Sequence, residues 1–154
     1  MIEHRQLPMV RRSQLGDRPI PDQCKDAVIL VDTLGELSAI WGLADLAFVG
    51  GSLLPGRGGQ NMMEPAAFGA SVYFGKYTSN FRDTVSLLMS RDAATIVDNS
   101  SELSGMIHKD LQNKTERLMR GMRARELVMA QVGATTRTVA ELERLMEPVM
   151  RTNK

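Results

Sequence analysis

Three segments of this sequence hold most of the residue types that could bind a ligand. They are Asp32–Glu36, Gly50–Glu64 and Gly75–Asn80, and each follows an apolar run. Glycine lets a backbone approach a ligand closely, and carboxylates accept hydrogen bonds from hydroxyl groups. No Ser/His/Asp arrangement emerges from the spacing. The residue types therefore favour binding of a polar, hydroxylated ligand.

The middle segment is rich in glycine, which occupies five of the ten positions from Gly50 to Gly59. Ordering so many glycines costs backbone entropy, so a plain connecting loop seldom contains them. The segment leads into a predicted helix, whose free N–H groups favour anions. It resembles a phosphate-binding loop but has neither the GxxxxGK[ST] nor the GxGxxG spacing, and it lacks the P-loop lysine needed for ATP hydrolysis. Its candidate supporting residues are Gly51, Ser52, Gly58, Gly59 and Gln60.

Several side chains in these segments have two interpretations each. Glu36 either completes a capping box with Thr33 or holds a polar ligand at a helix start. Glu64 is either an ordinary acidic residue in a first helical turn or, with Glu36, a group that grips sugar hydroxyls. Asn61 either caps the same helix or binds a base or phosphate. Lys76 is either a solvated loop lysine or a phosphate partner.

Short apolar runs and helical periodicity alternate along the chain. This alternation predicts an α/β fold, with a Rossmann-like parallel sheet and helices on both faces. In such sheets ligands bind beyond the carboxyl ends of the strands, where the three segments lie. The expected strands are 27–31, 46–49, 71–74 and 94–97. The expected helices are 37–46, 62–68 and 80–89. After the last strand, the rest of the chain is expected to be helical to about Leu145.

The domain organisation follows from length and pattern. The 154 residues fit one domain, with a loop and strand lead-in over 1–26, βα repeats over 27–98 and C-terminal helices over 99–147. The run at 27–31 is wholly apolar, so we expect a strand buried on both faces. Asn80 is expected to cap the helix that follows it.

Composition excludes several classes of function. The chain is 43% hydrophobic and 24% charged, with a net charge of +1, so bulk charge favours neither nucleic acid nor membrane. Cys24 is the only cysteine, and His4 and His108 are far apart, so the spacing indicates no disulfide framework and no metal site. No cofactor is indicated. No apolar run approaches the roughly 18–20 residues of a membrane span, so we expect a cytosolic protein or one peripheral to a membrane's inner face.

Basic residues cluster in the C-terminal helical region. One interpretation is an amphipathic helix that packs on the sheet and presents a solvated basic face. The other is contact with anionic lipid headgroups. The residues are Lys109, Lys114, Arg117, Arg120, Arg123 and Arg125.

The motifs, taken together and in order, resemble the C-terminal domain of 3-deoxy-D-manno-octulosonic acid (Kdo) transferases, glycosyltransferase family 30. The resemblance runs over most of the chain. It is carried by 32–37, 44–53 and 58–67, with Arg11–Ser13, Asn80–Phe81 and Val132–Thr135 in addition.

The resemblance implies a GT-B fold, in which two Rossmann-like domains face each other across a cleft. It implies transfer of Kdo from CMP-Kdo to a lipid A precursor, lipid IVA, at the cytoplasmic face of the inner membrane of Gram-negative bacteria, in lipopolysaccharide biosynthesis and without a metal. The positions that match CMP contacts are Leu34, Gly35, Glu36, Asn61, Met62, Met63 and Glu64.

The same resemblance places the catalytic base, a glutamate, in an N-terminal domain that would also bind the lipid acceptor. We therefore expect this chain to be inactive alone. The family's usual Gly-Gly-His-Asn reads Gly58-Gly59-Gln60-Asn61 here, and Gln60 cannot carry a charge. A different class of function, a stand-alone nucleotide-binding or regulatory module, would use the same loops without catalysis.

Overall fold

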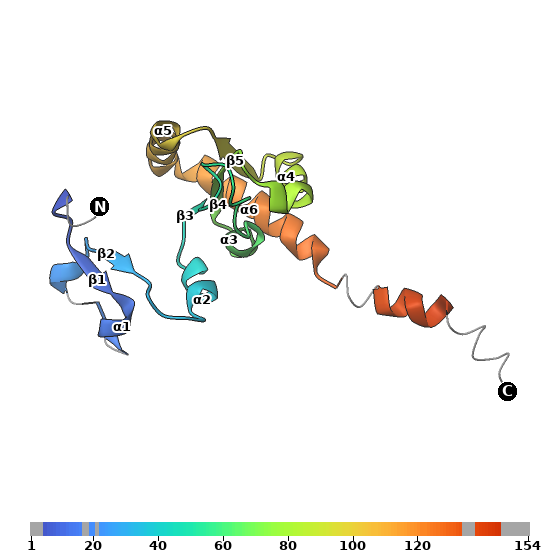
Figure 1. Ribbon diagram of the computed structural model, residues 1–154, viewed down its shortest axis with the longest axis horizontal. Helices are drawn as coiled ribbons and strands as arrows, with labels where there is room; N and C mark the ends of the chain where they lie inside the picture. Colours follow the sequence, from blue (N-terminus) through green and yellow to red (C-terminus); the bar gives the residue numbers. More distant parts are fainter. Residues whose placement is uncertain (1–4, 17–18, 21, 134–137, 146–154) are drawn as a thin grey trace. The chain divides into compact units, whose positions relative to one another are not determined.

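The structure is a computed structural model that describes residues 5–16, 19–20, 22–133 and 138–145 (Figure 1). The chain divides into two compact units, Met1–Leu43 and Ala44–Lys154, and each is described by itself. The division falls inside the predicted 27–98 segment. Two predictions, the match at Ala134–Thr135 and the helix end at 146–147, lie outside the described residues.

The first unit holds a small parallel sheet. Strand β1 pairs with β2, and Met9 aligns with Val28. The expected burial of this second strand is wrong, since Val28, Ile29 and Leu30 are 37%, 42% and 37% exposed. Among the described residues of this unit, the other elements are short helices, and these do not cover both faces of the two-stranded sheet. The elements are β1 (Met9–Arg11), α1 (Arg12–Leu15), η2 (Asp22–Cys24), β2 (Val28–Leu30) and α2 (Leu37–Trp41).

Helix α2 is shorter than the predicted 37–46. Gly42 donates to the Ala39 carbonyl at 3.2 Å, and Leu43 donates to Ile40 at 2.9 Å. These three-residue hydrogen bonds tighten the last turn and end the helix. Apolar periodicity alone did not locate this end, because Ala44 and Leu46 continue the pattern.

The second unit is the α/β fold that the sequence predicts. Its strands are parallel in the order β3-β4-β5, and Phe48 and Thr95 align with Tyr73 from either side. The helix expected from Asn80 begins at Arg82, after a turn of 3-10 helix. The elements are β3 (Leu46–Val49), α3 (Met63–Ala67), β4 (Ser71–Gly75), η3 (Ser79–Phe81), α4 (Arg82–Met89), β5 (Ala94–Val97), α5 (Ser100–Gln112) and α6 (Lys114–Gln131), with 138–145 also helical.

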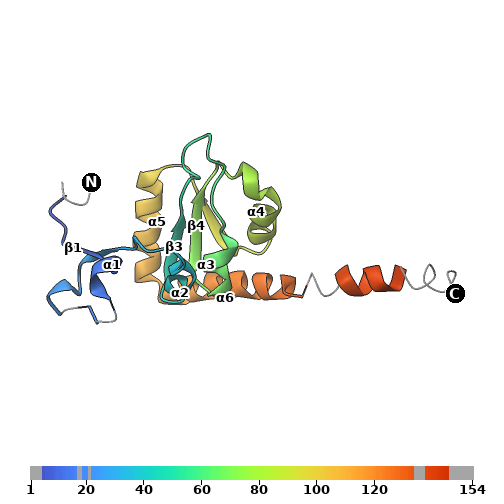
Figure 2. The same cartoon turned by 60° about the horizontal axis from the view of Figure 1, so that its bottom comes forward.

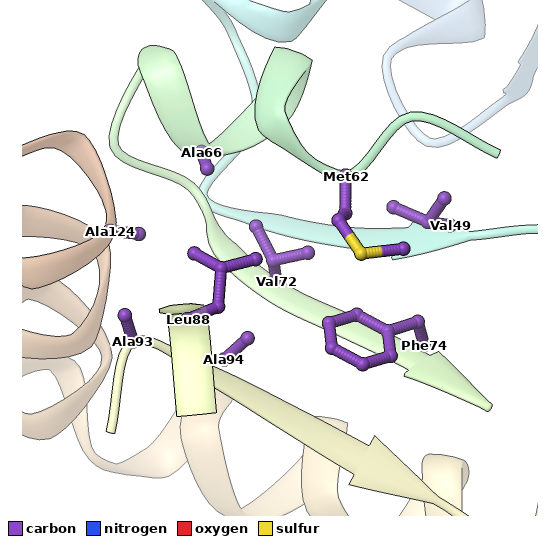
Figure 3. Packing of buried hydrophobic residues seen from close by; sticks show 9 residues of the cluster. All are labelled: Val49, Met62, Ala66, Val72, Phe74, Leu88, Ala93, Ala94 and Ala124. Carbon is purple, nitrogen blue, oxygen red and sulfur yellow. The ribbon is translucent and has the colours of Figure 1, made fainter. Parts of the chain in front are cut away.

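Strand β4 lies at the centre of this unit and is buried along its whole length. Val72 and Phe74 pack on one face with Val49, Met62 and Leu88, as Figure 3 shows. Four alanines complete this cluster and let the helices approach closely: Ala66, Ala93, Ala94 and Ala124. Burial on both faces is typical of a parallel strand covered by helices.

The other face of β4 carries a buried polar network. Asp110 of α5 accepts hydrogen bonds from the Tyr73 hydroxyl, from Ser71 Oγ at 3.3 Å and from Arg120 Nη1 at 2.6 Å. Arg117 Nη1 donates to the Asp110 carbonyl at 3.1 Å. A buried carboxylate requires such partners, since desolvation penalises an unpaired charge.

This network corrects the interpretation that the clustered basic residues together form a solvated face. Arg117 is only 8% exposed, and the side chain of Arg120 is 13% exposed. Arg123 donates to the Asp92 carbonyl at 3.0 Å. The exposed basic side chains of the cluster are Lys109, Lys114 and Arg125. The sequence pattern could not locate Asp110 as the partner that draws arginines inward.

Helix α6 crosses the second unit at the end of the sheet away from the glycine-rich loop, as Figure 2 shows. A Cβ atom on Gly121 would lie 1.9 Å from the carbonyl oxygen of Gly69. Two backbones therefore touch at this crossing, and only glycine fits. Within the described ranges, no helix is both long and apolar enough to cross a membrane.

Substitution Gly121→Ala should destabilise the chain by about 1–3 kcal/mol, because a methyl group has no space against a backbone carbonyl. Gly105→Ala is the matched control, since its Cβ would meet nothing within 4 Å in helix α5. There alanine should stabilise by about 0.5–1 kcal/mol. Urea unfolding followed by circular dichroism measures both, and equal effects would contradict the close crossing.

Burial and the hydrogen bond to Asp110 raise the pKa of Tyr73 from 10.0 to about 12. A phenol with a higher pKa in the folded chain stabilises the fold fully below pH 10. That contribution is lost as the pH rises from 10 to 12. As the pH rises from 10 to 12, the free energy of unfolding should therefore fall less for Tyr73→Phe than for the parent. Absorbance at 295 nm in a Tyr77→Phe background, where Tyr73 is the remaining tyrosine, should show titration near pH 12. Ionisation near pH 10 in the folded chain would contradict this.

Candidate functional site

The glycine-rich loop begins where β3 ends. Gly51, Gly56, Gly58 and Gly59 have φ angles of 72°, 99°, 74° and 83°, a region that other residues rarely adopt. Gly59 donates its N–H to the Gly51 carbonyl at 3.0 Å, which closes the loop on itself. The glycines are thus required by the backbone path.

Ser52 fixes the start of the loop to the end of β4. Its buried hydroxyl donates to the Val49 carbonyl at 2.6 Å and accepts from the Gly75 N–H at 2.8 Å. A Cβ on Gly75 would lie 2.2 Å from the Ser52 carbonyl oxygen. Tyr77 donates its N–H to that same oxygen at 2.9 Å. Ser52 therefore joins the end of β3 to the end of β4 at the start of the loop.

Asn80 fixes the far side of the loop. Its Nδ2 donates to the Arg57 carbonyl at 3.2 Å, and its N–H donates to the Gly58 carbonyl at 3.2 Å. The prediction that Asn80 caps the next helix is wrong, because no side chain caps α4. Its amide instead binds a loop distant in sequence, which local pattern could not reveal.

Asn61 and Glu64 follow the loop at the start of α3. Asn61 Oδ1 accepts from the Met63 N–H at 3.1 Å, and its Nδ2 donates to Glu64 Oε1 at 3.1 Å. Both side chains are exposed, as is Gln60. Met62 between them is fully buried, so only its backbone can face a ligand, and Met63 is half-buried. The chain thus presents a pre-oriented amide and carboxylate to solvent.

The first unit contains the third set of predicted residues. Glu36 Oε1 accepts from Arg12 Nη2 at 2.8 Å, and its other oxygen accepts from the Thr33 hydroxyl. The predicted capping box is wrong, because α2 begins at Leu37 and Glu36 is its uncapped N-cap residue. Leu34 is fully exposed, and Gly35 has a φ of 84°.

Asp32 holds the Arg-Arg-Ser segment beside this turn. Its carboxylate accepts from the Ser13 N–H at 2.9 Å, from Ser13 Oγ at 2.8 Å and from Arg11 Nη1 at 3.4 Å. The hydrogen bonds from Ser13, the backbone one first, lower the pKa of Asp32. Sequence reasoning missed that Arg12 and Ser13 are the partners of Glu36 and Asp32.

Lys76 lies directly after β4. Its Nζ is 3.1 Å from Asp98 Oδ1, and its side chain is 54% exposed. The hydrogen bond and the negative charge of Asp98 raise the pKa of Lys76. Lys76 is therefore a loop lysine that pairs with Asp98 and remains exposed to solvent.

The structure brings the second-unit candidates together at the carboxyl edge of one sheet: Gly51, Ser52, Gly58, Gly59, Gln60, Asn61, Met62, Met63, Glu64 and Lys76. Leu34, Gly35 and Glu36 lie in the first unit, and each half of the predicted site is described by itself. Across the described ranges, no group of three or more His, Cys, Asp or Glu side chains is arranged to hold a metal ion.

Comparison with solved structures defines the class of fold. The chain superposes with a TM-score of 0.71 on the crystal structure of the C-terminal CMP-Kdo binding domain of WaaA from Acinetobacter baumannii. The match is 24% identical and covers 82% of this chain and 64% of that one. This is the fold of the C-terminal half of a GT-B glycosyltransferase, as the sequence predicts.

The chain is also similar in sequence to curated proteins. The chain is 32% identical over 148 residues to the 3-deoxy-D-manno-octulosonic acid transferase of Haemophilus influenzae and 37% identical over 144 residues to that of Bordetella pertussis. These matches cover 96% and 89% of this chain, but only 34% and 31% of the relatives. The chain thus spans about a third of their length. No protein-family model matches it. The resemblance to the C-terminal domain of Kdo transferases is confirmed.

The loop geometry predicts a specific coupling between Gly58 and Asn80. A Cβ on Gly58 would lie 2.6 Å from the Asn80 side chain, whereas one on Gly56 would meet nothing within 4 Å. Both positions have positive φ, so alanine costs each about 1–2 kcal/mol in backbone strain. We expect Gly58→Ala to be the more destabilising, and Asn80→Ala to relieve part of its extra cost in the double variant. Urea unfolding of the parent, of Gly58→Ala, of Asn80→Ala and of the double variant measures the coupling, with Gly56→Ala as the comparison for backbone strain. Strictly additive effects of Gly58→Ala and Asn80→Ala would contradict the coupling.

Proposed function

We propose that this chain binds CMP-Kdo as the donor-binding domain of a Kdo transferase, which transfers Kdo to a lipid A precursor. The observation that carries the proposal is the glycine-rich loop, tied at Ser52 and Asn80, that ends in the exposed pair Asn61 and Glu64. The similarity to Kdo transferases supports the same ligand. It does not favour a stand-alone regulatory module.

The carboxylates of Glu36 and Glu64 are the groups that would accept hydrogen bonds from the hydroxyls of the nucleotide. Glu64 Oε1 is held by Asn61, and its second oxygen has no partner among the described residues. Glu36 is oriented by Arg12 and by Thr33. Because both groups are positioned before a ligand arrives, binding would cost little side-chain entropy.

In the proposed reaction a base deprotonates the acceptor hydroxyl. Its oxygen forms a bond to the anomeric carbon of Kdo, and the bond from that carbon to the phosphate oxygen of CMP breaks with inversion. We assign the base to a glutamate of an N-terminal domain, as the family resemblance implies. The role of this chain is to hold the donor and to stabilise the departing phosphate with backbone N–H groups.

As the family resemblance implies, we place the proposed reaction at the cytoplasmic face of the inner membrane. The exposed basic side chains available for peripheral contact with anionic lipid are Lys109, Lys114 and Arg125. Arg117 and Arg120 do not contribute to such contact, because they serve the buried network around Asp110. Neither nucleic acid nor a cofactor has a role in this proposal.

Calorimetric titration of the chain with CMP tests the proposal. We expect binding, and about tenfold weaker binding in each of Glu36→Ala and Glu64→Ala, as for the loss of one hydrogen bond to a charged group. Glu126→Ala, at an exposed position of α6, is the control and should leave the affinity within about twofold of the parent. Failure of CMP to bind a chain shown to be folded would refute the proposal.

A further inference from the structure

A cavity of 310 Å³ lies beyond the carboxyl end of β4, beside the proposed donor site. Gly56 and Gly58 of the glycine-rich loop line one side. The segment that leads into α4 lines the other with Lys76, Tyr77, Thr78 and Arg82. None of these residues is among those that the sequence resemblance assigns to CMP, and Gly58 and Lys76 are supporting candidates only.

The lining of this cavity is cationic. Lys76 and Arg82 both line it, and it is lined by no aspartate or glutamate. Arg82 is exposed and has no hydrogen bond or ion pair with any described residue, so all five guanidinium donors are available. Lys76 gives one hydrogen bond to Asp98, and its ammonium retains two further donors. The hydroxyls of Tyr77 and Thr78 add neutral polar groups.

Hydrogen bonds hold the backbone on both sides of the cavity in place. Gly58 is buried, and its carbonyl accepts from the Asn80 N–H at 3.2 Å. The Tyr77 N–H donates to the buried Ser52 at 2.9 Å. Each side of the cavity is therefore hydrogen-bonded to the other, through Asn80 to Gly58 and through Tyr77 to Ser52. A frame fixed in this way reduces the ordering cost of binding.

We propose that this cavity is an oxyanion subsite, in which Arg82 is the principal cation and Lys76 the second. Its 310 Å³ is at the lower end of the roughly 300–1,000 Å³ of ligand pockets, so it fits one part of a nucleotide sugar. The proposal deepens the donor-binding function and rests on it for the identity of the ligand. The oxyanion is a carboxylate or a phosphate, and the donor carries both, since its sugar is an acid and its nucleotide a phosphate ester.

Binding of CMP-Kdo to the Arg82→Gln chain tests the subsite. Arg91→Gln is the matched control, because Arg91 is also exposed and does not line the cavity. Loss of a charge-assisted hydrogen bond should weaken CMP-Kdo binding about tenfold or more in Arg82→Gln, with less than about twofold change in Arg91→Gln. Equal affinities for the parent and Arg82→Gln, both shown to be folded by circular dichroism, would overturn the subsite and leave the donor proposal standing.

Titrations with CMP alone and with free Kdo identify the source of the anion. If Arg82→Gln weakens Kdo binding but not CMP binding, the subsite takes the sugar carboxylate. If CMP binding falls as far as CMP-Kdo binding, it takes the phosphate. Either pattern supports the subsite.

A separate readout distinguishes failure of the subsite from failure of the donor proposal. If CMP-Kdo does not bind the folded parent, the donor proposal fails. Titration with Kdo and with inorganic phosphate, followed on the Nε–H signal of Arg82 by NMR, then decides the subsite. A saturable shift that Arg91 does not share sustains it, and no shift with either anion overturns it.

Discussion

The close approach of Ser52 to Gly75 is the constraint on which the site depends. One hydroxyl joins the ends of β3 and β4, and the glycine admits the serine backbone to a distance that any side chain would forbid. The glycine-rich loop starts from this junction, and the segment carrying Lys76 and Tyr77 leaves from it. Both sides of the cationic cavity, the glycine-rich loop and the segment after β4, thus start at the contact between Ser52 and Gly75. A change at this contact would move both sides.

The opposite end of the sheet is organised by a different interaction. There Asp110 gathers Ser71, Tyr73 and Arg120, and α6 crosses against Gly69 with no side chain between. The charges of Asp110 and Arg120 are used by the fold, whereas Arg82 and Glu64 at the loop end keep unused donors and acceptors. The chain separates groups that hold it together from groups that can meet a ligand.

Much of the second unit could be predicted from sequence, because its signals are local. The apolar runs at β3 and β5 and the glycines after β3 report directly on burial and backbone path. Errors arose where a residue acts on a partner in another element. Asn80 binds the glycine-rich loop instead of capping α4, and Arg120 is drawn inward by Asp110 of α5.

The first unit was less predictable for another reason. The run containing β2 is apolar enough for a buried strand, but in the two-stranded sheet its described residues are only partly covered. Composition reports the tendency of a segment to be buried and cannot state which element covers it. The partners of Glu36 were likewise invisible, since Arg12 is 24 residues away in sequence.

Met62 has a consequence for the mechanics of recognition. Its side chain is buried in the core, whereas Asn61 and Glu64, which lie on either side of it along the chain, face solvent. The turn that carries these two residues therefore cannot move without disturbing the packing of Met62 against Phe74 and Val49. Such a turn is stiff. A ligand that matched it would be held by a surface already in its final shape, whereas a mismatched one would have to deform a packed interior. Selectivity at this position would then be elastic in origin, set by the stiffness of the core rather than by the number of polar contacts.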